Sequence, residues 1–388
     1  MTRKQLITLF IVNIIPPSIG TAFLGLLPVH LDRLGADPAT TGNYLAVAFL
    51  SLAISTIIAG RLSDLLQRRK ELLIAGGLLA IPCAWLMSEA TTITQLMILM
   101  AALWFAGGMV ATMVNILAGL YAEEHERGRV FGILWLCIPL SSVFTGLTTG
   151  QIVDRWGFEG LFVLAALLYI CVPVAGLFLS DKRVAPVKNE NAPSSLRMIF
   201  GSRTCVLLCF ASIIAHVANS ANILARPLIM DGLQYDATAI ASAAAAGGLV
   251  TLPLPLLIGW LSDRLGRKPF LVLCYLLSMG GLIALSAASQ LWHFWASSAL
   301  QTTLVASLVV GSALITDLFP KQMLGAPLAL FSATPWIGFV IGFSGAGTAM
   351  NAFGTIPMLM SGIVLTLIAI VLLIPIQRRQ PQYQVEAA

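Results

Sequence analysis

Four polar side chains follow one another along a single apolar run, 204–228. His216 precedes Asn219 by three residues and Asn222 by six. Arg226 follows four residues after Asn222. With about 3.6 residues per helical turn, this spacing places the four side chains within about a third of the helix circumference. An imidazole has a reference pKa of about 6.5, so a histidine on such a face can exchange protons near neutral pH.

Two interpretations are open for each ionisable member of this polar face. His216 lies near the middle of its run, where it either faces a solute pathway or forms a hydrogen bond with a neighbouring helix, and we favour the pathway. Arg226 lies toward the end of the run, where a long side chain either reaches the membrane interface or receives an anionic group of a substrate. We favour the interfacial anchor for Arg226.

Other chemistry-bearing patterns are weak or absent. The sequence contains no H-E-x-x-H, no phosphate-binding loop and no C-x-x-C, so we expect no metal and no cofactor. The stretch 342–345, Gly-Phe-Ser-Gly, resembles the motif of intramembrane serine proteases, but helix packing by glycine explains it better. The six cysteines all lie within apolar runs and are expected to act as small core residues.

The composition requires a lipid environment for most of the chain. Of 388 residues, 58% are hydrophobic and 10% are charged, and the mean hydropathy is +0.91. Soluble proteins average about 25% charged residues, so this chain cannot cover a water-facing surface. The composition also excludes a disordered chain and a small disulfide-stabilised secreted protein.

Twelve runs are long and apolar enough to cross a bilayer as helices, which takes about 20 residues. A barrel would show short alternating segments instead. The first run follows Arg3 and Lys4 without a cleavage site and is read as an uncleaved span. The expected spans are 6–28, 40–60, 71–88, 93–121, 128–152, 159–180, 204–228, 238–260, 269–289, 293–316, 325–350 and 355–376.

The basic residues predict the orientation of these spans. With the N-terminus inside, all of the 22 Lys and Arg residues except Arg33, Arg155 and Arg226 fall in inner segments, as the positive-inside rule requires. We therefore expect both termini in the cytoplasm and a multi-pass protein of the plasma membrane, the inner membrane of a prokaryote. The net charge of +5 reflects this topology, and we expect no nucleic-acid partner.

An internal repeat divides the chain. The loop after the second span reads GRLSDLLQRRK from Gly60, and the loop after the eighth reads GWLSDRLGRK from Gly259, 199 residues later. Such repeats are typical of transporters. We therefore predict an all-α membrane protein of two pseudo-symmetric six-helix bundles, 1–180 and 204–388, joined by a polar cytoplasmic linker, 181–203.

The doubled loop resembles the signature of the major facilitator superfamily, G-x-L-x-D-R-x-G-R-[RK], and the resemblance covers the whole chain. The second copy matches fully, whereas the first has Leu65 and Gln67 in place of an Arg and a Gly. The resemblance implies a cytoplasmic gate, in which Asp64 faces the helix start near Gly325 and Asp263 faces the one near Gly128. The gate residues implied are Gly60, Asp64, Arg68, Arg69, Gly259, Asp263, Arg264, Gly266 and Arg267. A further family-like stretch, GQIVDRWGF at 150–158, joins spans five and six.

The same resemblance places spans 1, 4, 7 and 10 around a central cavity. Each polar or aromatic residue on these spans either contacts a solute or packs between helices. The candidate cavity residues are Asn13, Thr21, Trp104, Thr112, Asn115, His216, Asn219, Asn222, Arg226, Gln301 and, on span 11, Trp336. No Asp or Glu lies in the middle of a span, so the expected cavity is apolar with a few hydrogen-bonding groups.

The resemblance implies a transporter that works by alternating access and is not an enzyme. We expect export of a small, fairly apolar organic solute in exchange for protons, by a monomer, as in the drug/proton antiporter-like branch. The antiporter motifs are degenerate: span 4 has no Arg, and only Pro139 remains of the span 5 motif. A uniporter or importer of a polar or anionic metabolite is the alternative, and a membrane-embedded enzyme or lipid-handling protein is a remote one.

Overall fold

The computed structural model describes residues 2–123, 126–181, 201–319 and 324–376, and within these ranges the chain forms only helices, turns and short connections. Most of the predicted linker, 182–200, lies outside the described residues. Eleven helical stretches are long and apolar enough to cross a membrane. The prediction of an all-helical membrane protein is therefore confirmed.

The helices agree closely with the apolar runs because a chain in lipid must satisfy its backbone hydrogen bonds within each segment. The expected run 93–121 and helix α4 have the same bounds. The helices are α1 (Arg3–Arg33), α2 (Pro38–Leu66), α3 (Arg69–Ser88), α4 (Ile93–Tyr121), α5 (Arg127–Trp135), α6 (Cys137–Leu177), α8 (Arg203–Gly232), α9 (Ala237–Thr251), α10 (Leu254–Leu265), α11 (Arg267–Ser286), α12 (Leu291–Gln301), α13 (Thr303–Leu318), α14 (Gly325–Phe353) and α15 (Thr355–Leu373).

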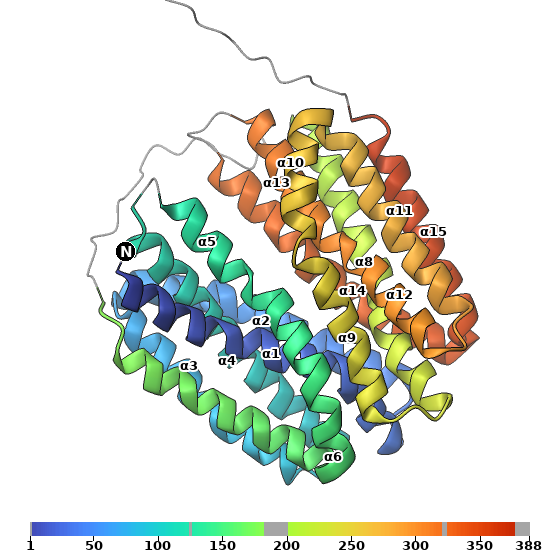
Figure 1. Ribbon diagram of the computed structural model, residues 1–388, viewed down its shortest axis with the longest axis horizontal. Helices are drawn as coiled ribbons and strands as arrows, with labels where there is room; N and C mark the ends of the chain where they lie inside the picture. Colours follow the sequence, from blue (N-terminus) through green and yellow to red (C-terminus); the bar gives the residue numbers. More distant parts are fainter. Residues whose placement is uncertain (1, 124–125, 182–200, 320–323, 377–388) are drawn as a thin grey trace, which may run out of the picture.

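Helix α6 consists of two helices joined at Gly157. This residue has φ 66° and ψ −174°, a backbone conformation that glycine adopts at little cost. The part before Gly157 packs on α9, where a Cβ at Gly150 would lie 2.6 Å from the backbone nitrogen of Thr238. The part after it packs on α3, where a Cβ at Gly77 would lie 2.8 Å from the Val172 side chain. Figure 1 shows the ribbon of α6 turning back beside α3.

Three apolar runs are interrupted within their length. The break between α5 and α6 falls at Leu136, just before Pro139, which cannot donate to the carbonyl of Trp135 and crowds it. The break between α9 and α10 falls at Pro253 for the same reason. The break between α12 and α13 at Thr302 has no proline; there the hydroxyl of Thr302 donates to the carbonyl of Ala299 at 3.0 Å, a bond that competes with the helical ladder.

The helices form two groups, α1–α6 and α8–α15, which lie side by side in Figure 1. We call residues 2–181 the N-terminal half and residues 201–376 the C-terminal half. The end of the molecule that carries Arg3 and the end of α15 is the termini end, and the opposite end, with the turns at Gly35, Gly157 and Gln234, is the distal end.

Lysines of the repeated loops form hydrogen bonds with carbonyls at the end of the last helix of each half, at the termini end. The ammonium of Lys70 donates to the carbonyl of Leu177 at 2.7 Å. In the C-terminal half, the ammonium of Lys268 donates to the carbonyls of Ile374 and Ile376. The last carbonyls of a helix have no helical hydrogen-bond donor and carry partial negative charge. A lysine ammonium there supplies the donor and compensates the charge.

Candidate functional site

The two halves are joined by polar contacts at and near the distal end. The guanidinium of Arg33 on α1 pairs with Asp231 on α8 at 2.6 Å. The carboxylate of Asp154 on α6 accepts the N–H groups of Ala237 and Thr238 at the start of α9, each at 3.0 Å. One helical turn or more further in, the hydroxyl of Ser344 on α14 donates to Asn43 on α2 at 2.6 Å. Within the described residues, every hydrogen bond or ion pair between the halves belongs to this group.

Aromatic rings join the halves at mid-depth. Phe49 on α2 lies 4.7 Å from Trp104 on α4, measured between ring centroids, and both belong to the N-terminal half. The same ring lies 4.7 Å from Phe339, 5.3 Å from Phe343 and 6.0 Å from Trp336, all on α14 of the C-terminal half. We call these five residues the aromatic cluster. Trp104 and Trp336 were expected from the sequence, whereas Phe49, Phe339 and Phe343 were not, because a phenylalanine that contacts the opposite half looks like any other in an apolar run.

One residue of the aromatic cluster, Trp336, is exposed. Phe49 is 3% exposed and Trp104 is 9% exposed, whereas Trp336 is 38% exposed. Trp336 is the twelfth residue of α14, counted from the termini end. The cluster therefore presents an indole at mid-depth, next to the point where the two halves meet.

His216 borders this cluster from α8. Its ring meets Phe339 edge to face, with centroids 5.4 Å apart, and its Nδ1 lies 2.8 Å from the carbonyl oxygen of Ser212. A Cβ at Gly338 of α14 would lie 2.6 Å from the Cβ of His216. The side chain is 4% exposed, so in this conformation it is packed between α8 and α14.

The rest of the polar face of α8 points into the C-terminal half. The amide of Asn222 donates to the hydroxyl of Ser297 on α12 at 2.9 Å and accepts from Arg226 at 3.3 Å. Gln301 on α12 donates to Asn219 at 2.6 Å, and its own Oε1 is buried without a hydrogen-bond partner. These side chains connect α8 with α12 inside one half, which is the inter-helix packing that the sequence left open as an alternative.

The candidates on α1 and α4 are not brought together with the α8 set by any described hydrogen bond. Asn13 donates to the carbonyl of Leu134 at 2.9 Å. The hydroxyls of Thr21 and Thr112 donate to carbonyls four residues earlier in their own helices. Thr21 also lies where α1 meets α6 and α9, near Thr145 and Ala241. Asn115 is exposed and forms no hydrogen bond with a described residue.

The first copy of the repeated loop encloses a buried arginine. Arg69 is 4% exposed, lies 4.0 Å from the carboxylate of Asp181 and donates to Gln67 at 3.0 Å. Gln67 has a positive φ of 54°, and so does Gly266 at the matching position of the second copy, with φ 98°. Asp64 is exposed, and its carboxylate forms no contact that the structure describes. Two of the remaining gate candidates, Gly60 and Arg68, lie at the end of α2 and immediately before α3.

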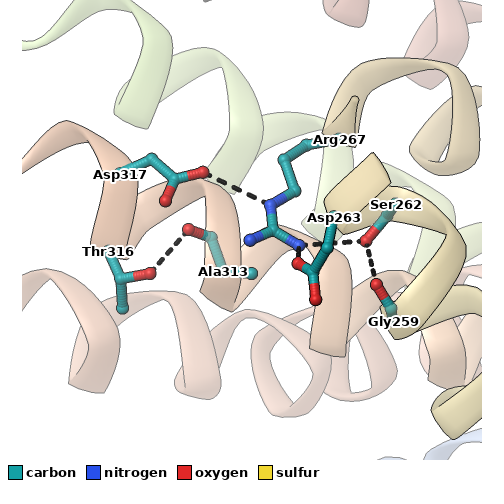
Figure 2. A network of polar contacts seen from close by, with 7 residues as sticks. All are labelled: Gly259, Ser262, Asp263, Arg267, Ala313, Thr316 and Asp317. Carbon is teal, nitrogen blue, oxygen red and sulfur yellow. Dashed lines mark hydrogen bonds and ion pairs between the residues drawn. The ribbon is translucent and has the colours of Figure 1, made fainter. Parts of the chain in front are cut away.

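The second copy forms a charge network, shown in Figure 2. The guanidinium of Arg267 contacts Asp263 and lies 3.3 Å from Asp317 at the end of α13. Arg264 stacks on the ring of Trp260, 3.9 Å from its centroid. All these partners belong to the C-terminal half, so the described contacts of Asp263 do not include the cross-half contact that the sequence suggested. Gly259 and Gly266 flank the network at the end of α10.

Comparison with known proteins places this architecture in a family. The model of the Major Facilitator Superfamily matches residues 9–210 and again 208–388. Sugar efflux transporter A of Dickeya chrysanthemi is 26% identical over 314 residues, covering 78% of each chain. A putative sugar efflux transporter of Deinococcus radiodurans is 24% identical over 369 residues, covering 91% of this chain and 92% of that one.

Two solved structures share the fold. The nucleoside transporter NupG has a TM-score of 0.78 at 12% identity, covering 96% of this chain and 98% of that one. A bacterial homologue of the human lysosomal transporter Spinster, in an inward-facing and unoccupied conformation, has a TM-score of 0.80 at 12% identity, covering 96% and 97%. The two family matches together span nearly all of the chain, and it therefore belongs to the Major Facilitator Superfamily, a family of transporters and not of enzymes.

Proposed function

We propose that the chain crosses the plasma membrane of a prokaryote twelve times, as two six-helix bundles, 1–180 and 204–388, with both termini in the cytoplasm. The helical stretch Arg129–Leu177 has 49 residues, about 74 Å at 1.5 Å per residue, whereas one crossing takes about 30 Å. Its change of direction at Gly157 supports two crossings. The distribution of Lys and Arg supports the orientation.

A single cysteine tests this topology. Arg155→Cys, in a background with the six native cysteines replaced, lies beside Gly157 at the distal end. We expect an impermeant maleimide to label it in intact cells. Labelling only after the membrane has been permeabilised would show that the distal end faces the cytoplasm and would overturn the orientation.

We propose that this protein exports a small, uncharged organic solute by alternating access, and that sugars are the first class of substrate to test. The aromatic cluster supports this function, because it lies at mid-depth where the halves meet and exposes the indole of Trp336. A sugar ring presents polarised C–H groups, which are attracted to the negative face of an aromatic ring. The names of the relatives from Dickeya and Deinococcus favour the same class.

Counterflow in proteoliposomes tests the substrate class. A panel of labelled mono- and disaccharides, nucleosides and lipophilic cations is offered to liposomes loaded with the unlabelled compound. We expect uptake of one or more sugars and about two- to tenfold weaker apparent affinity for Trp336→Ala, because an aromatic contact contributes about 0.5–1.5 kcal/mol. Trp85→Ala is the matched control, since Trp85 on α3 is 50% exposed and lies outside the cluster. Counterflow of cations but not of sugars would overturn the substrate class.

We further propose that export is coupled to protons through His216. Among the described residues, all Asp and Glu side chains lie at helix ends, at the Gly157 turn or in connections, which leaves His216 as the titratable group next to the aromatic cluster. A pH dye inside the liposomes should report proton movement when substrate is added, and His216→Gln should abolish it while leaving counterflow. Proton movement that persists in this variant would refute the role of His216.

The second candidate function is uniport or import of a polar or anionic metabolite. The position of Arg226 favours it, because within the described residues this guanidinium donates to the amide oxygen of Asn222 and no described carboxylate neutralises its charge. Counterflow of an organic anion with no pH change, lost in Arg226→Gln, would support this function over proton-coupled export.

A further inference from the structure

The carboxylate of Asp154 holds a helix of the other half. Its Oδ1 accepts the N–H of Ala237 at 3.0 Å. Its Oδ2 accepts both the N–H of Thr238 at 3.0 Å and the hydroxyl of Thr238 at 2.5 Å. One side chain of the N-terminal half therefore takes three hydrogen bonds from the first turn of α9 in the C-terminal half.

These hydrogen bonds pair backbone N–H groups that have no acceptor within α9 itself. The first N–H groups of a helix have no helical acceptor, and they give this end partial positive charge. The N-cap residue of α9, Asp236, accepts only from the N–H of Ala239, at 2.7 Å. Asp154 provides the acceptors for the two N–H groups that Asp236 leaves, so the first turn of α9 is fully paired only while the two halves touch.

The backbone around Asp154 allows this approach. One helical turn earlier, a Cβ at Gly150 would lie 2.6 Å from the nitrogen of Thr238, closer than a side chain can approach. Glycine at this position lets α6 come near enough to α9 for a short aspartate side chain to reach its first turn. The same end has a second cross-half contact, the ion pair of Arg33 with Asp231, in which the arginine side chain is 53% exposed. Asp154 is also exposed, but it accepts three hydrogen bonds from the first turn of α9, whereas a single exposed ion pair contributes little.

We propose that Asp154 is a gate residue of the transport cycle, the latch that holds the distal ends of the two halves together and must release before that side opens. This inference rests on the proposed alternating access. Asp154 positions the halves and contacts no substrate. Asp64 and Asp263, at the termini end, form no such contact with a described helix of the opposite half.

A distance measurement between the halves tests the latch. Spin labels at Glu89→Cys and Ala287→Cys, in a background with the six native cysteines replaced, report on exposed distal positions of the N-terminal and C-terminal halves. Asp154→Asn removes the charge and keeps one acceptor oxygen. We expect the ratio of long to short label distances to rise about tenfold, because a hydrogen bond to a charged group is among the stronger ones in proteins.

The matched control is Asp236→Asn. This variant makes the same change of side chain at the N-cap of the same helix, but its contact lies within one half. Because Asn caps a helix about as well as Asp, it should leave both the thermal stability and the distances nearly unchanged. An equal shift in Asp236→Asn and Asp154→Asn, or no shift in either, would overturn the proposal. Labels at Leu65→Cys and Leu265→Cys, at the termini end, should approach one another when the distal labels separate.

A second variant keeps the test decisive if Asp154→Asn does not fold. Thr238→Val preserves the shape of the side chain and removes only one of the three hydrogen bonds, so a two- to threefold rise in the long-distance population is expected. An unchanged distribution would refute the latch. If the distances shift as expected while no sugar is transported, the latch stands and the proposed substrate class fails.

Discussion

The contact between α6 and α9 makes a quantitative prediction at Gly146. A Cβ at this position would lie 2.9 Å from the carbonyl oxygen of Ala241 and 2.9 Å from the Cα of Ala245. Both atoms belong to the backbone, so they cannot move aside as a flexible side chain can. Overpacking of this kind costs about 1–3 kcal/mol. The cost applies only while the distal end is closed, because an open distal end separates α6 from α9.

Gly146→Ala should therefore lower the ratio of closed to open distal ends by about 5- to 150-fold, since 1.4 kcal/mol corresponds to a factor of ten. The distal spin labels at Glu89→Cys and Ala287→Cys measure this ratio. Gly20→Ala is the control, because a Cβ there meets nothing within 4 Å; it should stabilise α1 by about 0.5–1 kcal/mol and leave the label distances unchanged. Identical distance distributions for the two variants would refute the reasoning.

Three further substitutions should change thermal stability in detergent. Lys268→Met removes the donor to two carbonyls at the end of α15 and should cost about 1–2 kcal/mol; an unchanged melting temperature would contradict the cap. Ser297→Ala removes the acceptor of the shorter hydrogen bond from the buried Asn222 amide and should lower the free energy of unfolding by about 1–3 kcal/mol. A melting curve equal to that of the wild type would contradict this. Asp263→Asn should change stability by no more than about 1 kcal/mol and less at high salt, because Arg267 keeps its second carboxylate and both acids are more than half exposed.

The helices could be predicted from the sequence because a chain in lipid has few secondary structures that satisfy its backbone hydrogen bonds. Apolar runs must satisfy their own backbone, so the run 71–88 became α3 and the run 93–121 became α4. The turn between spans five and six was also predicted, and it falls at Gly157. The break at Thr302 could not be predicted, since threonines occur in many continuous helices and only the local hydrogen bonds of the hydroxyl distinguish this one.

The candidate site was harder to predict than the helices. The helical period shows which residues share one face of a helix, but it does not show which neighbouring helix that face contacts. The residues of α8 do lie on neighbouring faces, yet His216 contacts α14 while Asn219 and Asn222 contact α12. Phe49 resembles any other aromatic residue of an apolar run, and only the tertiary contact shows that it joins Trp104 to Trp336.

The two ends of the molecule use their carboxylates differently. At the termini end, Asp181 pairs with Arg69, and Asp263 pairs with Arg267, each inside one half. At the distal end, Asp154 pairs across the halves. The contact of a carboxylate with a helix N-terminus of the other half stays a prediction for Asp64 and Asp263 at the termini end. The contact of Asp154 was not predicted, because its partner lies 83 residues away along the chain and no local pattern identifies it.

This asymmetry has a mechanical consequence for the proposed cycle. Each described ion pair at the termini end lies inside one half, so separation of the halves there breaks none of them. Separation at the distal end breaks the bonds of Asp154 and the contact between Arg33 and Asp231. The aromatic cluster lies between the two ends and contributes non-directional contacts, which tolerate rotation better than hydrogen bonds do. In this conformation, therefore, the described polar contacts between the halves oppose opening at the distal end alone, and in the proposed export cycle a solute would reach the cluster from the termini end.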